Sequence, residues 1–232
     1  MRPHTLASIL ALAIAACSLC TGMANAQVPP SPAQVSQYKG LHAAAQRGDV
    51  AKLEKIIAQK ADLNARDEQG RTPLHVAAFA KQSQVIRLLA QAGADLSAME
   101  NDKYDAVTIA AVADDEATLA TLLSVGASAK LTTSRYDGTA LIAAAHLGHD
   151  GVVRQLIAAG APLDHVNNLH WTALIESIVL GDGGPRHQQT LRALIDAGAS
   201  QQLTDRQGNT PLQLARSRGY REMVVMLEQA KR

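Results

Sequence analysis

Cysteine and aromatic residues are scarce in this chain of 232 residues. The two cysteines, Cys17 and Cys20, both lie within the first 26 positions, so the remainder of the chain contains no thiol. That remainder can form no disulfide and perform no thiol chemistry, and its stability must come from packing. One Phe, one Trp and four Tyr, set against an abundance of Ala, fit a helical protein with a core of small aliphatic side chains.

Neither sign of charge is in excess. Arg2 is the only Lys, Arg, Asp or Glu in the first 26 positions, and the rest of the chain carries 21 basic and 21 acidic residues. A strongly basic face would indicate nucleic acid or an anionic membrane surface as the partner. The balance gives no such indication, and we expect no nucleic-acid partner.

The first 26 residues have the pattern of a bacterial export signal. Arg2 and His4 precede an apolar run over residues 6–16, and Ala24-Asn25-Ala26 forms a small-x-small cleavage site. The apolar run is too short to span a bilayer. We therefore predict a signal peptide over residues 1–26, no membrane insertion after its removal, and a periplasmic or secreted protein.

A second processing route stays open. Ile14-Ala15-Ala16-Cys17 resembles a lipobox, in which Cys17 would be lipidated and would become the first residue of an outer-membrane lipoprotein. Residues 27–36, which contain Pro29, Pro30 and Pro32, are predicted to form a Pro-rich, extended linker. In the lipoprotein this linker would act as a tether.

One motif recurs through the rest of the chain. Gly70-Arg71-Thr72-Pro73-Leu74-His75 returns as Gly208-Asn209-Thr210-Pro211-Leu212-Gln213, and partial copies begin at Thr139 and Thr172. The spacing between equivalent positions is 33 or 34 residues, except for a last step of 38. Those positions are Lys39, Thr72, Asp105, Thr139, Thr172 and Thr210.

The motif predicts two helices in each repeat. Thr caps a helix and Pro suits its first turn, where the missing N–H would have no partner. Paired aliphatic residues such as Val85-Ile86 and Leu88-Leu89 then give a second helix one buried face. Gly93 follows and supplies the left-handed residue that ends that helix.

These features resemble the ankyrin repeat, a unit of two antiparallel helices and a hairpin loop. The resemblance implies an all-α fold, an ankyrin-repeat solenoid of about six helix-turn-helix repeats joined by hairpin loops. The domain is expected over residues 37–232. Its repeats are placed at about 37–69, 70–102, 103–136, 137–169, 170–207 and 208–232.

Three departures from the repeat pattern stand out. Lys60 occupies a position where the later repeats have Gly, and Asp105-Ala106 replaces Thr-Pro in the third repeat. Five extra residues lie between the two helices of the fifth repeat, around residues 181–188. This Gly-rich insertion lacks the Lys-Ser/Thr ending of a phosphate loop. It is expected to be a longer surface turn, with a protruding loop that adds partner contacts as the alternative.

The resemblance implies a non-catalytic protein–protein interaction module that acts in the bacterial periplasm or envelope. Two alternatives are an immunity or inhibitor protein against a periplasmic effector and an accessory factor for a stress-defence enzyme. No Ser/His/Asp or Cys/His grouping and no metal motif is recognisable, so we expect no enzyme, cofactor or metal. His42 and His75 stand at the repeat's usual His position and are expected to bond to the backbone of an adjacent loop.

Partners of ankyrin repeats usually bind hairpin tips and the exposed positions of the first helix. Carried over residue by residue, the predicted tip residues are Glu68, Gln69, Arg71, Asn101, Asp102, Tyr104, Arg135, Tyr136, Asn168, Leu169, Trp171, Arg206, Gln207 and Asn209. The predicted first-helix residues are Phe79, Val112, His146 and Val179. Tyr104, Tyr136 and Trp171 fall on successive tips, and aromatic side chains are frequent interface anchors.

Overall fold

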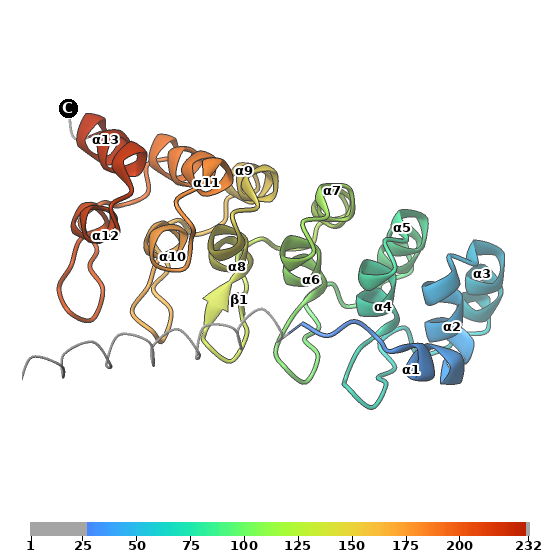
Figure 1. Cartoon of the computed structure of the whole chain (residues 1–232). Helices are drawn as coiled ribbons and strands as arrows, with labels where there is room; N and C mark the ends of the chain where they lie inside the picture. Colours follow the sequence, from blue (N-terminus) through green and yellow to red (C-terminus); the bar gives the residue numbers. More distant parts are fainter. Residues whose placement is uncertain (1–26, 231–232) are drawn as a thin grey trace, which may run out of the picture.

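The computed structural model describes residues 27–230. These residues form a stack of paired helices, which runs from the N-terminal pair on the right of Figure 1 to the C-terminal pair on the left. The predicted signal peptide and the candidate lipidation site at Cys17 lie outside the described residues. The first helices of the six pairs are α2 (Gly40–Arg47), α4 (Pro73–Phe79), α6 (Ala106–Val112), α8 (Ala140–Leu147), α10 (Ala173–Val179) and α12 (Pro211–Ser217). The second helices are α3 (Val50–Ala58), α5 (Ser83–Gln91), α7 (Glu116–Ser124), α9 (Asp150–Ala158), α11 (Pro185–Asp196) and α13 (Arg221–Gln229).

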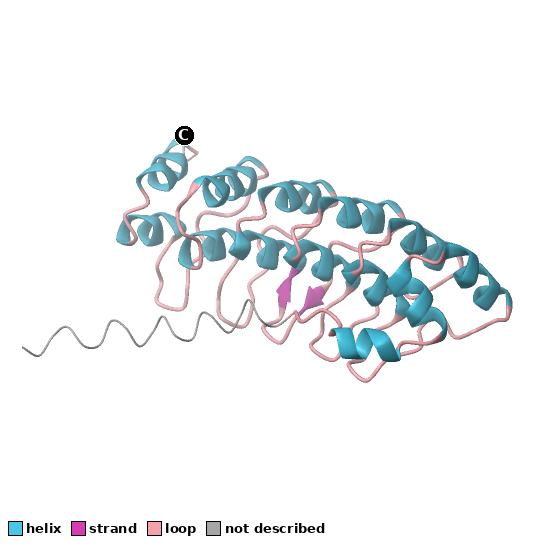
Figure 2. Cartoon of the chain, turned by 45° about the vertical axis from the view of Figure 1, so that its right-hand side comes forward, coloured by secondary structure: helices cyan, strands magenta, loops and turns pink. Residues whose placement is uncertain are grey.

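The helices form two layers. First helices pack against first helices and second helices against second helices, while hairpins link one pair to the next and project to one side (Figures 1 and 2). Two short antiparallel strands, β1 (Thr132–Thr133) and β2 (Gly138–Thr139), pair within the third hairpin, with Thr132 opposite Thr139. The predicted ankyrin-repeat solenoid is confirmed.

The core is a continuous band of small and aliphatic side chains. Ala44, Ala77, Ala110 and Ala144 are buried at equivalent positions of successive first helices, where their size lets neighbouring helices approach closely. Ser177 takes this place in the fifth repeat, and its hydroxyl donates to the carbonyl of Leu174 within the same helix. No repeat has an apolar face that it can bury alone, so stacking forms the core.

Helix ends follow the sequence signals, including those that depart from the pattern. Asp105 caps α6 because its Oδ1 accepts the Thr108 backbone N–H at 2.9 Å, as a Thr cap would. Lys60 ends its repeat with a φ of 57°, so it adopts the left-handed conformation that Gly93 and Gly198 adopt at φ 91°. The departures therefore change the residue and keep the geometry.

The predicted linker over residues 27–36 is extended only in its first part. Residues 32–37 form α1 (Pro32–Gln37), because Ser31 caps the helix, Pro32 suits its first turn and Gln34 completes a capping box. No residue of α1 is buried. The segment before α1 runs beside the hairpins of the first three repeats (Figures 1 and 2).

Candidate functional site

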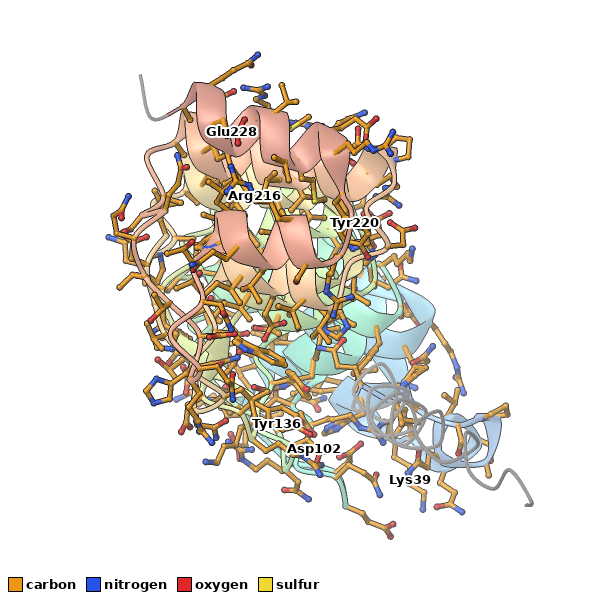
Figure 3. The ribbon with its side chains drawn as sticks, turned by 60° about the vertical axis from the view of Figure 1, so that its left-hand side comes forward. Lys39, Asp102, Tyr136, Arg216, Tyr220 and Glu228 are labelled. Carbon is orange, nitrogen blue, oxygen red and sulfur yellow. The ribbon has the colours of Figure 1, made fainter. Side chains whose placement is uncertain are left out.

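We call the surface formed by the first helices and the hairpins the groove face. It contains most of the residues that the sequence predicts to bind a partner. Figure 3 shows Asp102 and Tyr136 close together on the hairpin side of the stack, away from Arg216 and Glu228 of the last repeat. The geometry of the hairpins decides which of these side chains a partner can reach.

One polar side chain holds the turn of most hairpins. In the first hairpin, Asp67 Oδ1 accepts the backbone N–H groups of Gln69 and Arg71, both at 2.9 Å. The equivalent residues make the same pair of bonds to the backbone two and four positions later; they are Glu100, Asn167 and Asp205. The tips are consequently fixed by side chains and do not depend on Gly or Pro alone.

Backbone hydrogen bonds join successive hairpins. Asn101 donates to the carbonyl of Gln69 at 3.0 Å, and Ser134 donates to that of Lys103 at 2.8 Å. Side chains add to these bonds: Arg135 pairs with Asp102 at 2.8 Å across the second and third hairpins. The rim of tips is therefore a connected strip.

Two predicted tip residues are buried, which corrects that part of the prediction. Arg71 is 3% exposed because its Nε pairs with Asp67 Oδ2 at 2.7 Å and its Nη2 donates to Gln69 at 2.8 Å. Tyr104 is 8% exposed because its ring packs into the core cluster beneath the groove. Arg71 holds its own hairpin together, and neither side chain is presented on a tip.

The other predicted residues divide between exposed and half-buried positions. The exposed ones are Glu68, Asn101, Arg135, Asn168, Arg206 and Gln207. The half-buried tip residues are Gln69, Asp102, Tyr136, Leu169, Trp171 and Asn209, and the half-buried helix residues are Phe79, Val112, His146 and Val179. The structure brings Val112, Tyr136 and His146 together around one cavity, whereas Arg206 and Gln207 lie on the last hairpin.

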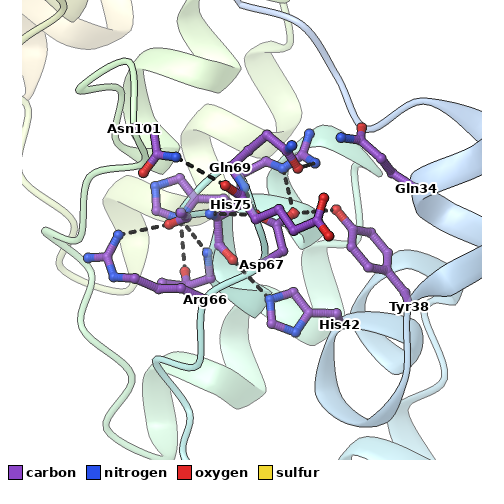
Figure 4. Close-up of polar contacts among 12 residues, drawn as sticks. Gln34, Tyr38, His42, Arg66, Asp67, Gln69, His75 and Asn101 are labelled. Carbon is purple, nitrogen blue, oxygen red and sulfur yellow. Dashed lines mark hydrogen bonds and ion pairs between the residues drawn. The ribbon is translucent and has the colours of Figure 1, made fainter.

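The first hairpin also anchors the N-terminal segment. The Tyr38 hydroxyl donates to Asp67 Oδ2 at 2.8 Å, and His42 Nε2 lies 2.9 Å from the carbonyl oxygen of Arg71 (Figure 4). Burial and the bond to Asp67 raise the pKa of Tyr38. Burial opposes ionisation of Asp67, but bonds from Arg71 and Tyr38 outweigh it and lower the pKa of that carboxyl.

The predicted roles of His42 and His75 are confirmed. His75 is fully buried, its Nδ1 lies 3.1 Å from the backbone nitrogen of Thr72, and its Nε2 lies 3.1 Å from the carbonyl oxygen of Tyr104 in the next hairpin. Burial lowers the pKa of His75 to about 4, so the ring is neutral at physiological pH. Both histidines link neighbouring repeats, and both ring nitrogens of His75 are engaged in hydrogen bonds.

Residues 27–30 lie along the groove face. Gln27 and Val28 line a cavity of about 100 Å³ with Phe79, Tyr104 and other residues of the second and third repeats. Gln27 also lines a second cavity of about 70 Å³, farther along the groove. The chain's own N-terminal segment thus covers part of the surface that the sequence assigns to a partner.

The second cavity contains a buried carboxyl that the sequence did not single out. Glu176 of α10 is 4% exposed, and its Oε1 accepts the side-chain amide of Asn167 at 2.8 Å. His146 Nδ1 lies 3.6 Å from the other oxygen, Oε2. Burial raises the pKa of Glu176 to about 8, and burial together with His187 and His149 lowers the pKa of His146.

The insertion in the fifth repeat lengthens α11 to 12 residues, against nine in most other second helices. Its turn is tied to the array, because the Tyr220 hydroxyl donates to the carbonyl of Gly181 at 2.8 Å and His187 Nε2 lies 2.9 Å from the carbonyl oxygen of His146. Arg186 pairs with Asp114 at 2.7 Å, two repeats away. The insertion is a packed surface turn, as the first of the two expectations has it.

Aligning the repeats of this chain with one another would have singled out Glu176 and Asn167. Glu176 occupies a place that is apolar in the neighbouring repeats, and Asn167 occupies a place that is acidic in three hairpins. A comparison of each repeat with the family motif does not reveal these two residues, because they are not part of that motif. Only comparison among the repeats of this chain shows them.

Two further classes of site are constrained by the structure. Within residues 27–230, no three His, Asp or Glu side chains come close enough together to bind a metal ion. Over the same residues, no helix has both the length and the apolar character that crossing a bilayer requires. These findings concern the described residues alone.

Comparison with known proteins agrees with this geometry. The family model "Ankyrin repeats (3 copies)" matches residues 12–100, 41–133, 107–205 and 141–231. The chain is 35% identical over 185 residues to the ankyrin repeat protein YahD of Escherichia coli (strain K12), which covers 79% of this chain and 92% of YahD. The protein therefore belongs to the ankyrin-repeat family, whose members generally act as non-catalytic protein-interaction modules.

Two solved structures extend the comparison. An ankyrin repeat domain (ABAYE2397) from Acinetobacter baumannii AYE is 45% identical, with a TM-score of 0.77, and the match covers 82% of this chain and 97% of that one. A chain in the complex of the predatory endopeptidase Bd0816 from Bdellovibrio bacteriovorus with the immunity protein Bd3460 is 26% identical. It has a TM-score of 0.64, and the match covers 83% of this chain and 98% of that one.

Proposed function

We propose that this protein is a non-catalytic binding module of the bacterial envelope and that it holds a partner protein on its groove face. The observation that carries the proposal is the course of residues 27–30, which lie along that face as an extended peptide. A surface that accommodates one extended segment has the shape to accommodate another. The exposed tips, Glu68, Asn101, Arg135, Asn168, Arg206 and Gln207, would complete the interface.

The predicted signal peptide supports the choice of the envelope. The first 26 residues carry the features of a signal peptide, and the predicted cleavage site precedes Gln27 directly. Cell fractionation followed by intact-mass measurement tests this step. A periplasmic or secreted chain that begins at Gln27 supports it, a lipidated chain that begins at Cys17 selects the outer membrane, and an unprocessed cytoplasmic chain contradicts it.

The partner is tested by affinity capture from envelope extract. The processed chain is immobilised through its C-terminus, beside a rim variant, Tyr136→Ala/Trp171→Ala, and an outer-layer control, Glu222→Ala/Val225→Ala. Both pairs remove partly exposed side chains, so similar stability is expected and is checked by thermal melting. A protein that is retained by the wild type and the control but lost with the rim variant supports binding at the groove face. Equal loss with both variants places the interface elsewhere.

A second function, inhibition of an envelope enzyme, is favoured by one finding. The array is similar in fold to one chain in the complex of an endopeptidase with an immunity protein, which supports this alternative. An inhibitor and an adaptor differ in their effect on the captured partner. If stoichiometric addition of this protein abolishes a catalytic activity of the partner, inhibition is the function; if the activity is unchanged, the adaptor remains.

A further inference from the structure

Two positions in this array depart from the type of residue that most other repeats carry. Along the first helices, the place of Glu176 is taken by apolar residues in four other repeats, namely Val76, Ile109, Ala143 and Leu214. In the hairpins, the place of Asn167 is acidic in three others, Asp67, Glu100 and Asp205. The two exceptions lie in consecutive repeats, Asn167 in the fourth and Glu176 in the fifth, and they bond to each other.

The amide at position 167 is chemically suited to the carboxyl at position 176. A carboxylate at position 167 would face the Glu176 carboxyl at hydrogen-bond distance, and two like charges so close disfavour ionisation of both. The Asn167 amide instead keeps the turn, since its Oδ1 accepts the N–H groups of Leu169 and Trp171, both at 3.0 Å. Its Nδ2 remains free to donate to Glu176. The hairpin thus supports the carboxyl without giving up its own geometry.

The carboxyl has one oxygen left for another group. Oε1 is bound by Asn167, whereas Oε2 forms no hydrogen bond among the described residues and faces His146 Nδ1 at 3.6 Å. Glu176 lines a cavity of about 70 Å³, and Gln27 lines the same cavity with its Nε2 buried and without a hydrogen-bond partner among the described residues. Because Oε2 makes no hydrogen bond among these residues, it can accept one from a ligand group.

The surroundings favour a cation over an anion or a neutral group. Among the described residues that line the cavity, Glu176 and His146 are the ones with an acidic or basic side chain, and Tyr104 and Tyr136 are the aromatic ones. Burial keeps the His146 ring neutral, with His187 and His149 adding to the same effect. Aromatic rings beside a carboxylate are the combination that binds organic ammonium groups.

We propose that the cavity at Glu176 is a recognition pocket for a lysine ammonium group, carried by an extended segment of the partner protein that takes the place of residues 27–30. The inference rests on the proposed binding at the groove face and names the chemistry of that contact. The ammonium group forms an ion pair with Oε2, the tyrosine rings flank it, and the bound carboxyl gives up its proton. A compact cation suits the volume of the cavity better than a guanidinium.

The chain itself offers a tethered probe. Gln27→Lys places an ammonium group at the cavity, and Val28→Lys is the matched control because Val28 is the next residue and its side chain is 67% exposed. Both variants are made in the full, unprocessed chain, so that the nitrogen of residue 27 is in a peptide bond. The pKa of Glu176 is read by NMR of its carboxyl carbon.

Gln27→Lys is expected to lower the pKa of Glu176 by about one to three pH units, because an opposite charge at close range favours the ionised form. Val28→Lys is expected to change it by far less. Equal shifts in the two variants, or no shift in either, would overturn the pocket. The reading does not depend on the partner, so it stands or falls separately from the proposed function.

A second measurement tests the segment in trans. A peptide of residues 27–34 with Gln27 replaced by Lys and an acetylated N-terminus is titrated into a chain without residues 27–31, whose core keeps all its buried side chains. We expect the peptide to bind about tenfold more tightly than the same peptide with acetyl-lysine. Glu176→Gln should remove this difference. Equal affinities of the two peptides for the wild-type cavity would contradict the assignment of an ammonium group.

Discussion

The Asn167 side-chain amide donates to Glu176 Oε1 at 2.8 Å, and this bond joins the fourth hairpin to the first helix that follows it. Each residue differs from its counterparts in the other repeats. The amide of Asn167 donates a hydrogen bond that the buried Glu176 carboxyl needs. The pair lies at the wall of the cavity that Gln27 also lines. Its chemistry can be tested without knowledge of any partner.

Glu176→Gln should change how stability depends on pH. The pKa of Glu176 is about 8 in the folded protein and near 4.5 when the chain is unfolded, so the folded state binds more protons between these values. The wild type therefore loses stability as pH rises from about 4.5 to 8. Glutamine has no such loss, and the stability of the variant should exceed that of the wild type by about 4 kcal/mol at pH 8 and by less than about 1 kcal/mol at pH 5.

Urea denaturation at pH 5 and pH 8 measures both differences. A gap between variant and wild type that is the same at the two pH values would contradict the buried, protonated carboxyl. Glu222→Gln on the exposed side of α13 is the matched control and should show no pH-dependent gap.

Asn167→Asp should destabilise the protein above pH 8 by about 2 kcal/mol, because Glu176 is ionised there and the substitution replaces its hydrogen-bond donor with a second acceptor. The double variant Asn167→Asp/Glu176→Gln exchanges the amide and the carboxyl and keeps one donor facing one acceptor. It should recover at least half of the lost stability, as a double-mutant cycle of denaturation curves would show. Additive losses would mean that the two side chains do not interact.

His75→Ala should cost about 3 kcal/mol, because the buried ring bonds to two repeats at once and its removal leaves a cavity. His42→Ala is the matched comparison and should cost less, since His42 is half-buried in the first repeat. The pKa of His75 is about 4 in the folded state, so the wild type should also lose stability as pH falls from about 6.5 towards 4. A flat acid profile, or equal costs for the two histidines, would contradict this account.

Lys60→Gly should stabilise the protein by about 1 kcal/mol. Lys60 is exposed and holds a φ of 57°, which Gly adopts without the steric penalty that a Cβ brings. Lys60→Ala removes the side chain but keeps the Cβ, so thermal melting should show no comparable gain. If both variants gain equally, the effect comes from loss of the Lys side chain and has nothing to do with backbone strain.

The sequence predicts the ankyrin-repeat solenoid, because the helices of the repeats have their own local signals. The Thr-Pro starts and the Gly ends mark the helices, and even Asp105 and Lys60 act as the residues that they replace. The insertion in the fifth repeat was placed correctly by counting. The repeat spacing did not predict how the insertion packs, because the hydrogen bond from Tyr220 to Gly181 joins residues of different repeats.

The candidate site was predicted less well, and the reason is physical. Family positions tell which side chains lie on the hairpins but not how each is used, and Arg71 is consumed by its own ion pair with Asp67. The burial of Tyr104 depends on packing across repeats, which local patterns do not encode. The course of residues 27–30 likewise arises from tertiary contact, whereas their Pro content alone favoured an extended linker.

Residues 27–30 are loosely packed on the groove face and affect any measurement of partner affinity. Val28 is largely exposed and α1 buries no side chain, yet the segment is attached to the array, where a short tether gives an effective concentration of about a millimolar. A partner that binds the groove face therefore competes with residues 27–30, whose local concentration does not fall on dilution because they are part of the same chain. Its apparent dissociation constant reports the fraction of molecules with an open groove as well as the contacts made, and this fraction depends on the residues that precede position 31.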